Sequence, residues 1–326
     1  PELRAKLEAL VALATQRLYT QQHYDGGWGW WTTDESQITL TAYALHGLLE
    51  AHRAGFAVDT DVMARAVGYL RENLPSITAE TDAAVANRLA YMLYVLGEYT
   101  GVFGEEVGEG ELGRANQLFA SRRLLDQYGQ AFLAMALHTL APEASSRVET
   151  LLSELLDHAI LSATGTHWEE ARPDYWNMST DVRSTAIVLW TLAQLKPDSP
   201  ELANGIRWLM AGRREGYWES TQTTAWVLLA LTEAMRATGE LEGDFACNLY
   251  LNGQLRAEGD ISRETLTEVQ ELQIAIAELE ADQANRLVLE RLPGPGRLYY
   301  TAQLRYFLPA EQVKALDRGL IVSRSF

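Results

Sequence analysis

The 326-residue sequence predicts a mainly α-helical protein: an α/α toroid over residues 1–237, followed by a small antiparallel β-sandwich domain over residues 238–316. Two observations lead to this expectation. One short phrase recurs five times before position 238, and the hydrophobic periodicity changes from helical to alternating near that position.

The repeated phrase consists of a polar residue, an alanine and a bulky apolar residue at the start of an apolar helical run. Its alanines lie far enough apart along the chain to leave room for two helices in each repeat. The second copy has a leucine in the polar slot. The copies are Thr41-Ala42-Tyr43, Leu89-Ala90-Tyr91, Gln130-Ala131-Phe132, Thr185-Ala186-Ile187 and Thr224-Ala225-Trp226.

Two kinds of helix are expected to alternate. Apolar helices that carry the phrase are predicted near residues 38–53, 81–99, 127–140, 180–195 and 221–237. Amphipathic helices are predicted near 4–19, 60–74, 112–125, 143–160 and 200–211. An apolar helix is buried all round and an amphipathic helix covers it from outside, so about five inner–outer pairs form the predicted toroid.

Beyond residue 238 the pattern is typical of strands. Residues 244–251 alternate between apolar and polar, and Asn252-Gly253 is a strong hairpin signal. Further strands are expected around residues 272–276, 287–289 and 298–307, and residues 317–326 are expected to begin another domain.

Composition limits the function. Lys and Arg number 27 against 44 Asp and Glu, and the net charge of −17 argues against nucleic acid and anionic membrane as partners. No apolar run reaches the length of a membrane span. The only cysteine, Cys247, cannot form an internal disulfide. Because the sequence starts at Pro1 and shows no signal peptide, we expect a fragment of a longer protein, with any membrane anchor outside it.

Two aromatic strings stand out. Gly26-Gly27-Trp28-Gly29-Trp30-Trp31 combines glycines that permit tight turns with tryptophans that can cover helix ends, and Gly216-Tyr217-Trp218 echoes it before Thr221 and Gln222. A structural role is favoured for both strings, with ligand stacking as the alternative. The acidic pairs Asp34-Glu35 and Asp59/Asp61 are expected at helix N-termini, where carboxylates are stabilised.

No cofactor and no metal site are expected. The six histidines form neither an H-x-H nor an H-E-x-x-H motif, and none lies near the cysteine in sequence. No nucleophile elbow, P-loop or dinucleotide fingerprint is present, so the residues give no sign of an enzyme.

The sequence resembles the thioester domain and flanking CUB-like domain of bacterial α2-macroglobulin-like proteins, relatives of complement. The stretch Asp25–Trp31 followed by Thr41-Ala42-Tyr43 is similar to the family's DGGWGWW…TAY motif. Ser220–Thr223 is similar to its STQ-T signature, and residues 294–300 resemble part of the CUB-like region.

This resemblance implies a protease trap of the cell envelope (periplasmic and lipid-anchored) or a secreted one, whose partners are the trapped proteases and the neighbouring macroglobulin domains. It also implies a toroid of six pairs whose first pair carries a Cys-x-x-Gln thioester. That motif is absent here, because Tyr250 stands three residues after Cys247. Either the motif precedes Pro1, or the protein belongs to the relatives that lack it.

The role of one residue is implied by the resemblance alone. Complement relatives carry a histidine that steers the thioester toward hydroxyl groups, and the matching position here is Asn87. An amide is not nucleophilic, so a thioester beside Asn87 would be expected to prefer amines. The structural alternative is a polar group near a helix start.

Two other functions remain open at this stage. The first is a thioester-free envelope protein in which the toroid serves as a docking body. The second, less favoured, is a toroid enzyme of the terpene cyclase or prenyltransferase type, for which the sequence lacks both the zinc set and the aspartate-rich motif.

Overall fold

The computed structural model describes residues 2–171, 174, 177–265, 268–298, 300 and 302–303. The chain divides into two compact units, Pro1–Gly239 and Glu240–Phe326, and each is described by itself.

Helices dominate the first unit, as the sequence predicts. The helices are α1 (Glu2–Gln21), α2 (Ile38–Arg53), α3 (Thr60–Glu72), α4 (Ala83–Phe103), α5 (Glu109–Ala120), α6 (Gln127–Leu140), α7 (Ser145–Asp157), α8 (Asp181–Leu195), α9 (Pro200–Ala211) and α10 (Thr221–Ala237). Short 3₁₀ turns cover Arg122–Leu124 and Pro142–Ala144 in this unit, and Glu240–Glu242 and Ile276–Glu278 in the second unit.

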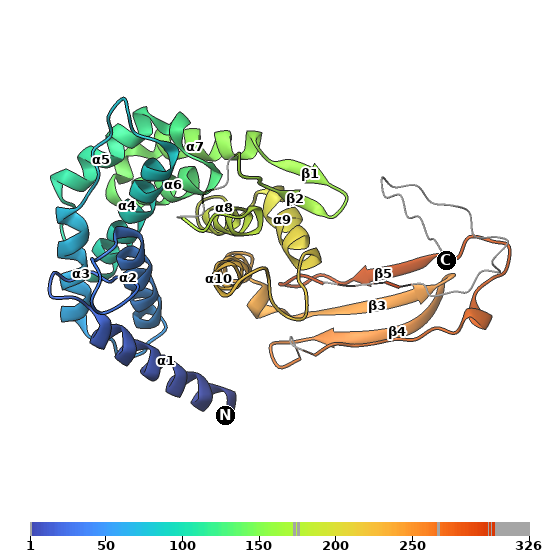
Figure 1. The fold of residues 1–326 in the computed structure, drawn as a ribbon. Helices are drawn as coiled ribbons and strands as arrows, with labels where there is room; N and C mark the ends of the chain where they lie inside the picture. The colour runs from blue at the N-terminus through green and yellow to red at the C-terminus, as the bar shows by residue number, and fades with distance from the viewer. Residues whose placement is uncertain are drawn as a thin grey trace, which may run out of the picture. The chain divides into compact units, whose positions relative to one another are not determined.

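The helices alternate between an inner and an outer layer. The inner helices α2, α4, α6, α8 and α10 follow one another, each packed against the next. In Figure 1, α3, α5 and α7 lie toward the outside of this curved row. The described helices lie close to the predicted ranges, so the alternating apolar and amphipathic pattern is confirmed as the basis of a mainly α fold.

Aromatic side chains fill the centre of the inner layer. The ring of Phe132 lies 4.8 Å from that of Tyr91 and 5.4 Å from that of Trp226, measured between centroids. Trp226 in turn lies 5.5 Å from Trp190. These rings come from α4, α6, α8 and α10, so the bulky residue of the repeated phrase and its neighbours one turn later join four repeats in one core.

Polar caps fix where the helices start. Asp59 accepts hydrogen bonds from two amides of the first turn of α3, as predicted for this acidic pair. Asp82, Thr180 and Ser220 cap α4, α8 and α10 in the same way. The expectation for Asp34 is wrong: α2 begins after Gln37, and the Asp34 carboxylate instead binds loop amides described below.

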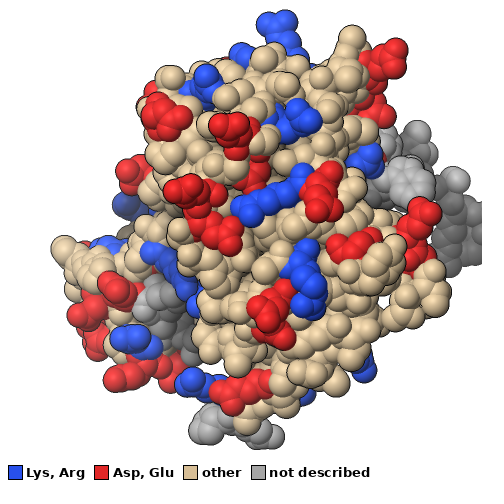
Figure 2. Space-filling model, turned by 90° about the vertical axis from the view of Figure 1, so that its left-hand side faces the viewer, with Lys and Arg blue, Asp and Glu red and all other residues tan. Residues whose placement is uncertain are grey.

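Charges on the outer face are mixed. Figure 2 shows acidic and basic side chains interspersed on the side where α3 and α5 lie. Arg71 of α3 pairs there with Glu111 and Glu105, at 2.7 and 3.3 Å. The excess of acidic residues therefore does not form a patch of one sign on this face.

The first unit also contains a hairpin that the sequence analysis missed. The strands β1 (Ile160–Ser162) and β2 (Gly165–His167) pair antiparallel between α7 and α8. Both strands are too short for a period-2 pattern to identify.

The second unit contains one antiparallel sheet of order β4-β3-β5 among its described residues, with β3 at Phe245–Leu251, β4 at Gln254–Ile261 and β5 at Leu287–Arg291. Asn252 and Gly253 both have positive φ, 52° and 80°, so the predicted turn is present.

Four expectations about this region are wrong or fall outside the described residues. Residues 272–276 form no strand, and Leu298 lies in none either. The side chains of Leu272 and Ile276 are exposed, so alternation alone did not reflect a packed face. Among the described residues of the second unit there is one sheet and no second layer, so a sandwich is not observed. Residues 304–326, including the expected start of another domain, lie outside the described residues.

Candidate functional site: the Gly-Trp loops and the ends of the inner helices

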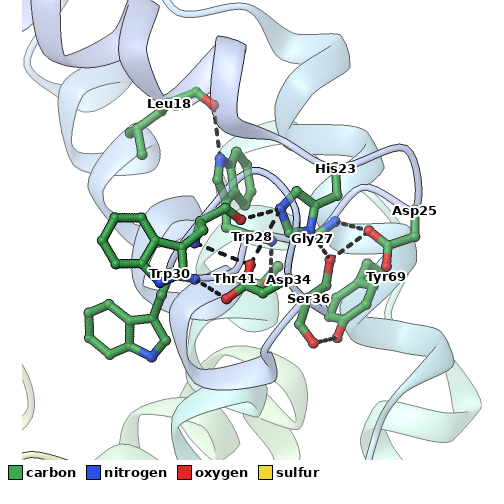
Figure 3. Close-up of polar contacts among 11 residues, drawn as sticks. Leu18, His23, Asp25, Gly27, Trp28, Trp30, Asp34, Ser36, Thr41 and Tyr69 are labelled. Atoms are coloured by element: carbon green, nitrogen blue, oxygen red, sulfur yellow. Dashed lines mark hydrogen bonds and ion pairs between the residues drawn. The ribbon is translucent and has the colours of Figure 1, made fainter.

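Trp28 joins an outer helix to the following inner helix. Its indole Nε1–H donates to the Leu18 carbonyl in the last turn of α1, at 2.8 Å. Its backbone N–H donates to Thr41 Oγ1, at 2.9 Å, and Thr41 is the polar residue of the repeated phrase in α2. Both side chains are buried. Figure 3 shows this tryptophan between the two helices.

The same arrangement occurs twice more. Trp168 donates to the Leu155 carbonyl of α7 and to Thr185 Oγ1 of α8, at 2.7 and 3.0 Å. Trp218 donates to the Leu209 carbonyl of α9 and, through its amide, to the Thr224 hydroxyl of α10, at 2.7 and 3.0 Å. We call each of these a Trp–Thr latch. In each latch, the polar first residue of the repeated phrase is a threonine. This correlation between a threonine and a preceding tryptophan could have identified Trp168 from the sequence.

The glycines of the first string allow the chain to pass closely over its neighbours. Gly26 has a φ of +88°, a conformation that side chains disfavour. A Cβ on Gly27 would lie 2.6 Å from Ser36 Cβ. Gly29 likewise has no room for a Cβ beside Asp34. Gly216 also has positive φ, at 96°.

A polar network holds the outer part of this loop. The Asp34 carboxylate accepts from the amides of Trp30 and Trp31, at 2.9 and 3.1 Å. His23 Nδ1 lies 2.9 Å from Ser36 Oγ. In Figure 3 the ring of Trp30 points away from this network, and its residue is 61% exposed. Trp28 is thus inaccessible to a ligand, whereas Trp30 is available to one.

The remaining predicted residues lie at the N-terminal ends of inner helices. Asn87, in the second turn of α4, is fully buried; its Nδ2 donates to Asp126 Oδ2 at 2.7 Å, and its Oδ1 accepts from the Asp126 amide at 3.1 Å. Asn87 therefore links the starts of α4 and α6. Thr221 begins α10, and Gln222 lines the same pocket as Asn87.

A larger apolar groove lies between α2 and α10. Its volume is about 590 Å³, and Leu40, Ala44, Leu228 and Leu229 contribute to its walls. Leu228 is 53% exposed. At the inner end of the groove, His46 of α2 and Trp226 of α10 meet with ring centroids 5.4 Å apart, and the groove lies beside this contact.

His46 lines this groove from the side of the aromatic core. Its Nδ1 lies 3.2 Å from the hydroxyl of Tyr91, and its ring stacks on Trp190 with centroids 5.4 Å apart. Burial lowers the pKa of His46 to about 3, with a smaller contribution from Arg53, so the imidazole is neutral at physiological pH.

The residues described above include no cysteine that could form a thioester. Cys247 lies on β3, half-buried, opposite Gly259 of β4 and Arg291 of β5. No group of three His, Cys, Asp or Glu within the described part of the chain could hold a metal ion. None of the helices described is both long and apolar enough to cross a membrane.

The alternating inner and outer helices and the Trp–Thr latches define an α/α toroid. The family model "A-macroglobulin TED domain" matches residues 2–234, and the chain belongs to this family.

Relatives and solved structures agree with this assignment. An "Alpha-2-macroglobulin" of Thermotoga maritima is 27% identical over 236 residues, which cover 70% of this chain and 12% of the relative. An "Alpha-2-macroglobulin homolog" of a Nostoc species is 24% identical over 96% of this chain and 16% of the relative. The chain thus spans less than a fifth of either relative.

Among solved structures, Escherichia coli α2-macroglobulin activated by porcine elastase matches with a TM-score of 0.57 and 22% identity, over 80% of this chain and 23% of that one. Salmonella α2-macroglobulin reacted with methylamine matches with a TM-score of 0.56 and 21% identity, over 79% of this chain and 16% of that one. These likenesses establish the fold.

Proposed function

We propose that this chain is the thioester-domain part of a bacterial α2-macroglobulin-like protein that traps attacking proteases. The match of the A-macroglobulin TED family across residues 2–234 carries the proposal. The partners of the intact protein would be the proteases and its own neighbouring macroglobulin domains, its place would be the cell envelope or the exterior, and it would not act as an enzyme.

Trapping would be covalent in this proposal. A lysine amine of the protease attacks the acyl carbon of a Cys–Gln thioester, an amide forms and the cysteine leaves as a free thiol. The two residues of that thioester are not Cys247 and a partner within this chain, because the residue three positions on is Tyr250. They would come from another part of the intact protein.

The groove between α2 and α10 offers a place for that part. Its walls are apolar, like the surfaces that the inner helices present to one another, and Leu228 of α10 is exposed in it. A further apolar helix of the intact protein would fill it and bury Leu228, with a favourable free energy of about 25 cal/mol for each Å² of apolar surface removed from water.

Asn87 bears on which nucleophile reacts. Both ends of its amide bind Asp126, so the side chain is oriented by the start of α6 and offers no basic nitrogen to a thioester. Preference for amines over hydroxyl groups therefore remains our prediction for the intact protein.

Incubating the intact protein with a protease such as elastase tests the proposal. A denatured gel should show a protease band shifted to the mass of a covalent complex. The trapped protease should also keep its activity on small peptides and lose it on large proteins. Pretreatment with methylamine is the matched control, and it should abolish the shifted band.

A thioester-free docking protein of the envelope is the second candidate, favoured by the absence of a Cys-x-x-Gln motif from this chain. In that case the protease would cleave the intact protein without any covalent product, and methylamine would change nothing.

A further inference from the structure

The N-terminal ends of all five inner helices border one small pocket. Thr39 of α2, Arg88 of α4, Tyr128 of α6, Arg183 of α8 and Gln222 of α10 all line it. Each helix N-terminus adds a partial positive charge from the helix dipole. The pocket therefore combines five helix ends with two arginines, in a chain whose net charge is −17.

Arg183 is the central group of this pocket. It is only 4% exposed, and its guanidinium lies 4.6 Å from the ring of Tyr128 and 5.6 Å from that of Trp226. Its Nε and Nη1 have no hydrogen-bond partner among the described residues. An arginine remains charged even when buried, and buried N–H groups without an acceptor are unfavourable.

Two acidic residues near Arg183 accept hydrogen bonds from other groups. Asp126 is bound to Asn87. Asp174 accepts from Asn177 and from the Tyr128 hydroxyl. Glu170 lies outside the pocket lining, and neither of its carboxyl oxygens has a hydrogen-bond partner among the described residues. Burial, and secondarily the charge of Asp126, raise the pKa of this carboxyl to about 8. Among the described residues, no carboxylate belongs to the pocket lining.

Other polar atoms complete the site. Gln222 Oε1 and Asn177 Oδ1 are buried without a partner among the described residues. The Gln222 amide can reorient to donate instead, whereas the Asn177 amide is held by its Nδ2 bonds to Asp174 and the Ala84 carbonyl. Arg88 is half-buried and also lines the pocket. The lining thus offers several donors and, within the part of the chain that the structure describes, lacks a carboxylate that would satisfy them.

The size of the pocket limits what enters it. Its volume of about 20 Å³ accommodates a water-sized group and little more. A charged guanidinium donates strong hydrogen bonds to carboxylate oxygens, and the unpartnered Nε–H and Nη1–H of Arg183 are both available as donors. We propose that this pocket binds a carboxylate group, supplied by a small organic acid or by an acidic side chain of a protein.

Binding of ¹³C-formate, followed by NMR line broadening at constant ionic strength, tests this directly. The protein should bind formate saturably, and chloride at the same concentration should not compete. A blocked glutamate, N-acetylglutamate amide, forms the second arm. Tighter binding of formate points to a small acid as the natural ligand, and tighter binding of the blocked glutamate points to a protein side chain.

Three variants decide whether the signal comes from this pocket. Arg183→Met should weaken binding by about tenfold or more, since it removes the charged donor pair. Arg88→Met should weaken it by roughly threefold, as expected for a half-exposed charge. Arg123→Met replaces an exposed arginine elsewhere on the same unit and should leave binding unchanged.

Absence of saturable binding in both arms would overturn the proposal, as would binding that persists in Arg183→Met. If Arg183→Met does not fold, Arg88→Met decides: unchanged binding in that variant contradicts the assignment. A pocket that holds only water would give no saturable signal with either probe.

Discussion

The Trp–Thr latch makes a quantitative prediction for Thr185→Val. Thr185 is fully buried; its hydroxyl accepts from the Trp168 amide at 3.0 Å and donates to the Trp168 carbonyl at 3.2 Å. Valine has nearly the same shape, so the substitution leaves the packing in place and removes both hydrogen bonds. A buried polar group without a partner costs about 1–3 kcal/mol, so the free energy of unfolding should fall by about 2–4 kcal/mol.

Two further threonines calibrate this value. Thr191, in the same helix, is equally buried, but its hydroxyl only donates to the Ile187 carbonyl one turn earlier. Thr191→Val should cost less than about 1 kcal/mol. Thr224 makes the equivalent latch to Trp218 in a half-buried position, where water can replace the lost bonds, so Thr224→Val should cost about 1 kcal/mol.

Urea unfolding followed by far-ultraviolet circular dichroism measures all three variants, since the signal reports on the helical unit. The predicted order of destabilisation is Thr185→Val, then Thr224→Val and Thr191→Val. Equal losses in Thr185→Val and Thr191→Val, within the error of the unfolding measurement, would refute the view that the latch stabilises the toroid.

Three other predictions follow from the same contacts. Gly27→Ala should destabilise by about 1–3 kcal/mol because its Cβ would meet Ser36; Gly47→Ala on α2, with open space around it, should stabilise by about 0.5–1 kcal/mol, and thermal unfolding compares the two. Asn87→Ala should cost about 2–3 kcal/mol because it removes two buried hydrogen bonds with Asp126, and Asn116→Ala, on the outer helix α5, is the control in the same urea assay. Because the folded pKa of His46 lies near 3, the unfolded chain takes up a proton below about pH 6.5 that the folded chain does not; wild type should lose about 2 kcal/mol more stability between pH 7 and pH 5 than His46→Phe. Equal pH slopes for the two proteins would count against a neutral buried His46.

The helical half of the chain was predictable because most of the inner helices are more apolar than the outer helices that cover them. Burial in a two-layer arrangement imposes these patterns on the sequence, and N-cap residues such as Asp82 and Ser220 mark the starts. The β region was less predictable. Residues 272–276 alternate in hydrophobicity, but no neighbouring strand pairs with them among the described residues, and pairing is a non-local property that periodicity does not contain.

The candidate site, too, was predictable from the sequence only in part. The sequence pointed to the Gly-Trp strings, but it could not show that Trp28 is enclosed by α1 and α2 while Trp30 faces outward, because neighbours in a loop differ only in their tertiary contacts. Arg183 was missed altogether. A single arginine in an apolar helix gives no motif, and its significance arises from the convergence of five helix ends that lie far apart along the chain.

Methylamine treatment of the intact protein tests the central claim most directly. Intact mass and free thiol are measured before and after the reaction. The account predicts one methylamine added per molecule, together with one new thiol besides that of Cys247. No mass change and no new thiol would contradict covalent trapping and favour the thioester-free docking role.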